Sequence, residues 1–439
     1  MTSLLHPNAA GIDISSREHV VAVPENRDTP SVRKFGSFTQ DLHRLIYWLK
    51  QCEIDTVAME STSVYWYHLY TMLLDAGIEV YLVNAHHVKR VPGRKSDIND
   101  AQWLQQLHSF GLLKSCFQPD NLTRVLRTVV RQRKQIIQQM TAQVQRMQKA
   151  LEQMNIKLHN VITDITGKTG RDIITAILSG ERNEEKLSRL ADYRIKASPQ
   201  TIIKSLQGNW REEQLFTLQI AYDHFRFLES QLEQCDQEAE KIINRFETIS
   251  NKKVKPKRKM ANQPKFNVEQ YLAHIYGVDV TNIPGIKATV GLSILSETGP
   301  YLKQKFQTEK QFLSWINVVP DNEITGGKVV KSRVKKKKNK AGQAFREAAN
   351  TLWRAQNPLG DMLRKRKAQK GSNSAIVYMA RKLASIYYTM VTEIEEYDQN
   401  QVVLINRKYL EKKLKYLQKI SKSIEMQLAE SQLINLAVR

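Results

Sequence analysis

Between residues 8 and 120, short apolar runs alternate with stretches of helical periodicity. Apolar runs bounded by polar turns predict five strands, which are residues 10–14, 19–23, 32–36, 54–59 and 78–83. The first two are joined by a polar turn and predict a β-hairpin. Apolar positions spaced by three and four predict three helices, which are residues 39–52, 65–76 and 97–110. This order of elements is typical of an α/β domain with a mixed sheet.

Beyond residue 120, the apolar positions step by three and four over much longer stretches. One such seam runs from Ile137 to Leu158 and a second runs from Phe225 to Ile242. Both predict long helices, which could pair as an antiparallel coiled coil. An ordinary helical bundle explains the same pattern equally well. Residues 160–215 predict shorter helices with breaks at glycines.

A linker and a final heptad run complete the predicted organisation. Residues 251–265 are basic and contain proline, and the apolar positions from Leu410 to Leu428 again follow a heptad, which favours oligomerisation. We therefore expect five segments. They are an α/β domain (1–120), a helical or coiled-coil region (121–250), a linker (251–265), a mainly helical domain (266–398) and a helical tail (399–439).

Charge separates the first segment from the rest of the chain. The net charge is +23, but residues 1–120 carry 11 basic and 13 acidic residues, whereas the remainder carries 56 basic and 31 acidic residues. A basic body attracts phosphates and a slightly acidic domain can hold cations, so this distribution favours a nucleic-acid enzyme. The alternative is a basic solvated surface without a partner.

Cysteine usage and hydropathy exclude several other classes of protein. The chain has three cysteines without pair spacing, which argues against a disulfide framework or a zinc site and favours a reducing cytoplasm. The N-terminal segment is too short and polar for a signal peptide, and no apolar run approaches the ~20 residues that cross a bilayer. We therefore expect a cytoplasmic protein without a membrane partner.

Four carboxylates stand where the predicted strands and helices of the first domain meet. Asp13 lies within the first strand, Glu60 ends the fourth, and Asp97 and Asp100 open the helix after the fifth. The spacing of three places the last two on one helix face. Convergence of so many like charges requires cations, and hard oxygen ligands select Mg²⁺ or Mn²⁺. The alternative for the final pair is a helix cap and a first-turn acid.

The sequence around these acids resembles the RuvC-like domain of the DEDD insertion-sequence transposases, the IS110/IS1111 family. The matching stretches are GIDIS, AMESTSVYWYHLYTMLLDAGIEVYLVNAHHVK and KSDINDAQWLQQL. The resemblance implies a ribonuclease-H-like fold, with Asp13, Glu60, Asp97 and Asp100 as the catalytic metal ligands. It also implies a bacterial or archaeal, nucleoid-associated enzyme that recombines DNA under the guidance of a structured bridge RNA, working as a dimer or tetramer.

A second resemblance covers residues 282–299, 312–355 and 357–391. The family carries a nucleophilic serine just before a glycine in this loop, acting beside the carboxylates of another subunit, and here that position is Thr325. Threonine keeps the hydroxyl, but its β-methyl group crowds an in-line attack. Ser332 is the nearest serine and the rival candidate. A strand-transfer-defective chain is the remaining possibility.

Basic and glycine positions near both sets of residues are candidates for contact with nucleic acid. Eight of the thirteen residues from Lys328 to Lys340 are basic. The candidates are Lys89, Arg94, Lys95, Gly285, Lys328, Lys331, Arg333 and Arg346. The alternative for the basic run is a solvated loop. Tyr65, Trp66 and Tyr67, after Glu60, are expected to pack within their helix rather than to stack on bases.

Three functions remain open at this point. The leading one is an RNA-guided transposase or recombinase that uses divalent metal and a loop hydroxyl. A RuvC-like, structure-selective nuclease would use the same acids with water as the attacker. A catalytically impaired nucleic-acid-binding relative would explain the absent serine, whereas the four acids argue against it.

Overall fold

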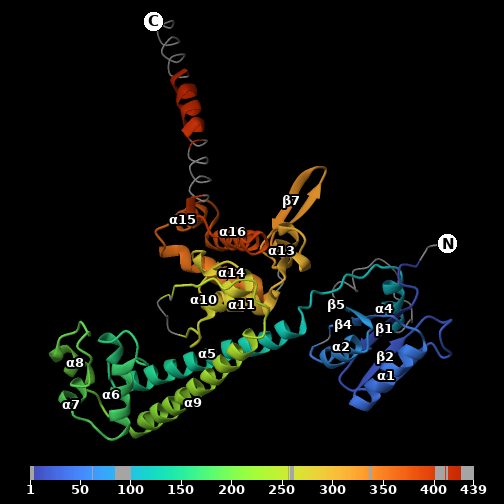
Figure 1. Ribbon diagram of the computed structural model, residues 1–439. Coiled ribbons are helices and arrows are strands. Elements are labelled where there is room, and N and C mark those ends of the chain that lie inside the picture. Colours follow the sequence, from blue (N-terminus) through green and yellow to red (C-terminus); the bar gives the residue numbers. More distant parts are fainter. Residues whose placement is uncertain are drawn as a thin grey trace. The chain divides into compact units, whose positions relative to one another are not determined.

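The computed structural model describes residues 4–61, 63–84, 100–255, 257, 262–335, 339–400, 411 and 414–426. The chain forms two compact units, Met1–Gln118 and Pro119–Arg439 (Figure 1). The first unit is an α/β domain and the second is built mainly from helices.

The first unit is built on a five-stranded mixed sheet. Its strands are β1 (Ala9–Ile14), β2 (Glu18–Ala22), β3 (Val32–Gly36), β4 (Thr56–Glu60) and β5 (Glu79–Val83). The strand order is β3-β2-β1-β4-β5, with β1 antiparallel to β2 and parallel to β4. Its helices are α1 (Thr39–Gln51), α2 (Trp66–Asp75) and α4 (Asp100–Ser109). The predicted α/β domain with a mixed sheet is confirmed.

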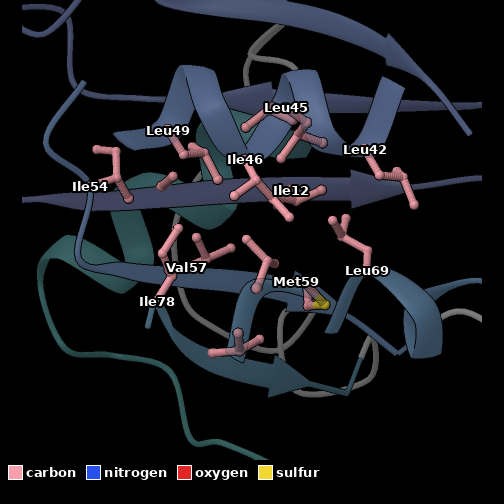
Figure 2. Close-up of a cluster of buried hydrophobic side chains, with 14 of the residues drawn as sticks. Ile12, Leu42, Leu45, Ile46, Leu49, Ile54, Val57, Met59, Leu69 and Ile78 are labelled. Carbon is pink, nitrogen blue, oxygen red and sulfur yellow. The ribbon is translucent and has the colours of Figure 1, made fainter. Parts of the chain in front are cut away.

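Helices cover both faces of this sheet because the strands are apolar on both faces. Alternate residues such as Ile12, Val57 and Met59 pack against α1 and α2 in one core (Figure 2). Ala58 and Val83, which point to the other face, pack against α4 in a second core. A sheet buried on both sides holds the ends of its strands in a fixed arrangement.

Two long helices dominate the first part of the second unit. α5 (Asn121–Gln153) and α9 (Glu212–Ile243) lie side by side and run in opposite directions (Figure 1). The shorter helices between them are α6 (Lys168–Leu178), α7 (Glu184–Ser188) and α8 (Pro199–Leu206), with a 3-10 turn at Leu158–Asn160. One apolar core joins all five α-helices. The long helices predicted for this region are present.

The remaining helices pack around buried aromatic side chains. They are α10 (Val268–Tyr276), α11 (Ala288–Thr298), α12 (Leu302–Lys305), α13 (Glu309–Trp315), α14 (Lys340–Thr351), α15 (Pro358–Lys370) and α16 (Ser372–Glu393), with 3-10 turns at Val280–Asn282 and Leu352–Arg354. Phe345 packs against Phe312 and Tyr387, and the Tyr387 hydroxyl donates to that of Tyr276. Arg131 on α5 donates two hydrogen bonds to the Glu297 carboxylate on α11, which connects these helices to α5.

The stretch predicted as a basic loop contains a β-hairpin instead. β6 (Asp321–Thr325) and β7 (Lys328–Arg333) pair antiparallel and project from the helices around them (Figure 1). In the tail, residues 414–426 are helical and Leu414, Leu417 and Ile424 are exposed. Leu410 and Leu428 lie outside the described residues. None of the helices described is long and apolar enough to cross a membrane.

Candidate active site

The register of the sheet places Asp13 and Glu60 side by side. β1 and β4 are parallel neighbours, and Ile12 lies opposite Met59. Asp13 and Glu60 are the next residues on their strands, and each is partly exposed. Parallel neighbours are about 4.8 Å apart across the sheet. Two carboxylates therefore occupy the same level of adjacent strands.

The pleat directs both acids to the sheet face that α4 covers. Ile12 and Met59 point into the core beneath α1 and α2. Because successive side chains on a strand point to opposite faces, Asp13 and Glu60 point to the other face. Ala58, two residues before Glu60, packs against α4 and confirms that direction.

A glycine in β1, Gly11, lets the start of α4 pack closely against this face of the sheet. A Cβ atom added to Gly11 would lie 2.2 Å from the carbonyl oxygen of Ala101 and 2.4 Å from the amide nitrogen of Gln105. The first turn of α4, which begins at Asp100, therefore lies directly against β1. Asp13, Glu60 and Asp100 thus stand on one face of the sheet. Asp97 lies outside the described residues.

We expect Gly11→Ala to weaken both stability and activity. The added methyl group would push α4 away from β1, because its nearest neighbours are backbone atoms that cannot rotate aside. Overpacking of this kind costs about 1–3 kcal/mol. Urea unfolding should show that loss, and DNA cleavage should fall as Asp100 moves away from Asp13. Unchanged unfolding and cleavage would contradict the close contact.

The far end of α4 is anchored by a buried histidine. The His108 Nε2 atom lies 2.9 Å from the Oγ1 atom of Thr56, the first residue of β4. Its ring stacks on His6 at 4.7 Å and contacts Tyr81. Burial lowers the pKa of His108 to about 4, so the ring is neutral at physiological pH. This anchor, which the sequence analysis missed, sets the position of α4 along the strands.

The donor set suits a hard divalent cation. The three acids offer only carboxylate oxygens, the ligands that Mg²⁺ and Mn²⁺ prefer. Among the residues the structure describes, no three acidic, histidine or cysteine side chains are arranged to hold a metal ion. The predicted site contains a fourth ligand, Asp97, which is not among those residues.

Both candidate hydroxyls lie on the β6–β7 hairpin. Thr325 ends β6 and pairs with Lys328 across the turn formed by Gly326 and Gly327, whose φ angles are 56° and 75°. Ser332 pairs with Asn322, farther from the turn. The register of the hairpin shifts between Glu323 and Ile324, so an irregularity separates the Ser332 pair from the Thr325 pair. Both residues are exposed.

Comparison with protein families connects these two parts of the chain. Residues 10–156 match a DEDD transposase model of the IS110 type, which spans Asp13, Glu60 and Asp100. Residues 279–363 match the model described as "Transposase IS116/IS110/IS902 family", which spans the hairpin. Together they cover just over half of the chain.

The chain belongs to the IS110 family of transposases. It is a DNA transposase or recombinase, as the sequence predicted, and DNA is its partner. Membership in the DEDD group also implies the use of a divalent metal, usually Mg²⁺ or Mn²⁺. No curated protein matches the chain.

Arg346 of the transposase braces the base of the hairpin. Its Nη2 atom donates to the carbonyl oxygen of Asn317 at 2.5 Å, and burial lowers the pKa of its guanidinium. The Asn317 side chain in turn donates to the carbonyl oxygen of Lys335 at 2.8 Å. The two ends of the hairpin are thus held together. Contact of Arg346 with phosphate stays a prediction.

The other predicted nucleic-acid contacts fall into three groups. Gly285 has φ 91°, and a Cβ atom there would lie 2.6 Å from the carbonyl oxygen of Ala348, so glycine lets its turn pack on α14. Among the basic residues of β7, Lys328 and Arg333 are exposed, and Lys331 forms an ion pair with Glu323 at 2.6 Å. The third group, Lys89, Arg94 and Lys95, lies outside the described residues.

Proposed function

We propose that this transposase cuts and exchanges DNA strands at a carboxylate site in its first unit, using a hydroxyl from the β6–β7 hairpin as the nucleophile. The observation that carries the proposal is the register that places Asp13 and Glu60 on adjacent strands, on the face covered by α4. Thr325 at the tip of the hairpin is exposed and supplies the hydroxyl in this proposal.

The four carboxylates would hold the metal. Asp13, Glu60, Asp97 and Asp100 are the ligands in this proposal, with Mg²⁺ as the natural ion and Mn²⁺ as a substitute. Bound cations of this type stabilise the charge that develops on the attacking and leaving oxygens of a phosphoryl transfer. The chain itself positions Asp13 and Glu60 through the sheet and Asp100 through the contact of α4 with Gly11.

Thr325 is the better nucleophile candidate by position. It is the last residue before a two-glycine turn, where a Cβ atom on either glycine would meet nothing within 4 Å. A scissile phosphate can therefore approach its Oγ1 atom from the tip. Lys328 lies directly across the hairpin from Thr325 and would neutralise phosphate charge beside the attacking oxygen. The attack would join the threonine oxygen to phosphorus and break the bond from phosphorus to one deoxyribose oxygen, which leaves as a free DNA hydroxyl after taking up a proton in place of the one that threonine loses. The energy of the broken ester bond would be conserved in the covalent protein–DNA link.

Ser332 remains the second candidate because it carries the same hydroxyl without the β-methyl group. It lies within β7, away from the turn, and its cross-strand partner is Asn322. A phosphate would reach it from the side of the ribbon instead of the tip.

A partner RNA and a second copy of the chain complete the proposal. The excess of basic residues after residue 120 supports binding of a structured guide RNA. The exposed apolar positions of the 414–426 helix support self-association, as a dimer or tetramer. In such an assembly the carboxylates of one subunit would act on DNA together with the hydroxyl of another.

Two alanine variants and one serine variant test the nucleophile. In a recombination assay supplied with the RNA that co-purifies from the native host, Thr325→Ala should lower strand exchange by at least about 10³-fold. Thr325→Ser should retain or raise activity, because it keeps the oxygen and removes the β-methyl group. Ser332→Ala is the matched control and should stay near the parent rate.

If Ser332→Ala loses strand exchange and Thr325→Ala keeps it, Ser332 is the nucleophile. If neither alanine variant loses activity, covalent hydroxyl catalysis by this hairpin is wrong. DNA cleavage that continues without any covalent adduct would then favour the nuclease, with water as the attacker.

A further inference from the structure

Shortly after Glu60, Ser61 and Ser63 each take part in a hydrogen bond that fixes their position. The Ser61 N–H donates to the carbonyl oxygen of Val83, at the end of β5, at 2.9 Å. Ser63 adopts a left-handed backbone with φ 50°. Its carbonyl oxygen accepts a hydrogen bond from the Trp66 indole Nε1 at 3.1 Å. Non-glycine residues in this conformation cost about 1–3 kcal/mol and are concentrated at functional sites.

This shape separates the three aromatic residues at the start of α2. Trp66 packs inward, with its ring 5.6 Å from that of Tyr67 and 5.5 Å from that of Tyr70. Tyr65 remains 45% exposed and Val64 remains 73% exposed. The prediction of helix packing is therefore confirmed for Trp66, which packs on the core, whereas Tyr67 is 44% exposed, much like Tyr65. The strained turn presents an aromatic ring to solvent just after a catalytic-site carboxylate.

The charge around this ring suits a nucleic-acid strand. α2 begins immediately after Tyr65 and has no acidic residue in its first turn, nor a side-chain cap on its N–H groups. The first turn of α2 therefore adds no negative charge at the positive end of its dipole, an end that favours phosphate. An exposed aromatic ring beside a phosphate-favouring backbone is the combination with which proteins hold unpaired nucleotides.

We propose that Tyr65 stacks on an unpaired DNA base next to the scissile phosphate and so selects strand-separated DNA at the cleavage site. The inference rests on the proposed function, because it takes Glu60 to mark the place of cleavage. A base that leaves the duplex loses its stacking, and the exposed ring replaces part of that loss. Stacking of this kind accepts every base, so it recognises the unpaired state and not the sequence.

Two substitutions and one matched control test this role kinetically. Loss of a stacking aromatic costs between about 5-fold and about 150-fold in binding. With full-length protein and a DNA substrate, Tyr65→Ala should raise KM for cleavage within that range, whereas Tyr65→Phe should stay within about 2-fold of the parent. Tyr47→Ala removes a tyrosine on α1 that is 65% exposed and should change nothing. Equal KM values for the alanine variants of Tyr65 and Tyr47 would overturn the proposal.

Photochemical cross-linking gives a readout that is independent of turnover. Single-stranded DNA carrying 5-iododeoxyuridine should cross-link to the peptide containing Tyr65, in the parent protein and in Tyr65→Phe, and mass spectrometry should locate the bond. Cross-linking at other aromatic residues with none at residue 65 would contradict the inference.

Glu60→Gln distinguishes failure of this inference from failure of the proposed function. An uncleaving Glu60→Gln protein that still cross-links at Tyr65 supports both. If Glu60→Gln does not cleave, and neither this variant nor the parent protein cross-links at Tyr65, the stacking role alone is overturned. A Glu60→Gln protein that cleaves at the parent rate overturns the placement of cleavage at Glu60 and the stacking role together.

Discussion

Glu60→Gln is expected to lower DNA cleavage by at least about 10³-fold while leaving the fold intact. Glu60 ends β4 beside Asp13 and points to the sheet face covered by α4. Glutamine has the same length but no negative charge, so it weakens the hold on a divalent cation without creating a cavity. Single-turnover cleavage of a labelled DNA substrate at saturating Mg²⁺ measures the effect.

Glu79→Gln is the matched control for this substitution. Glu79 is the first residue of β5 and its side chain is exposed. It lies opposite Thr56, at the other end of the paired strands from Glu60. Its loss should leave cleavage within about 2-fold of the parent, since Glu79 lies at the other end of the strands from the proposed metal site. Thermal unfolding of both variants should match the parent. Equal cleavage by the Glu60 and Glu79 variants would remove the basis for a metal site on this face.

Asp236→Ala should destabilise the second unit by about 3–5 kcal/mol. Asp236 on α9 and Arg133 on α5 form an ion pair at 2.5 Å, and their side chains are only 4% and 3% exposed. The second Asp236 oxygen accepts from the Lys265 N–H at 3.1 Å, and Arg133 also donates to the carbonyl oxygen of Asn262 at 2.9 Å. Removal of the carboxylate would leave a buried guanidinium without its counter-charge. Chemical denaturation followed by the helical signal measures the loss.

A neighbouring exposed pair provides the comparison. Glu238 pairs with Lys241 on the same helix at 3.4 Å, and both side chains are exposed. Glu238→Ala should cost less than about 1 kcal/mol. Joint replacement of Arg133 by Met and Asp236 by Leu should restore most of the stability lost in Asp236→Ala, because no unpaired charge stays buried. Similar losses for Asp236→Ala and Glu238→Ala would show that burial does not strengthen the first pair.

The elements of the first unit could be predicted from the sequence because its strands and helices are bounded by clear turn signals and carry regular apolar positions. The arrangement of the acids could not. Asp13 and Glu60 lie at the same level of adjacent strands because β4 pairs with β1, although β2 and β3 come between them in the chain. Nothing local in the sequence specifies that long-range pairing. The close approach of α4 to Gly11 is hidden for the same reason, since a lone glycine in a strand has several explanations.

The hairpin was predicted as a loop because its strands bury nothing. Every residue of β6 is exposed, so the alternation of apolar and polar positions that marks a half-buried strand is absent. The available signal was the pair Gly326–Gly327, which is typical of a two-residue hairpin turn. The exposure of Tyr65 could not be predicted either, because periodicity does not reveal where a left-handed residue such as Ser63 redirects the chain.

The most direct test of the carboxylate site is to map where a bound metal lies along the chain. Fe²⁺ can replace Mg²⁺ in the protein–DNA complex, and with ascorbate and peroxide it generates hydroxyl radicals that cut the nearest backbone. The account predicts cuts close to residues 13, 60 and 100, suppressed by excess Mg²⁺ and absent in Glu60→Gln. Cuts confined to other segments, or an unchanged pattern in Glu60→Gln, would contradict it.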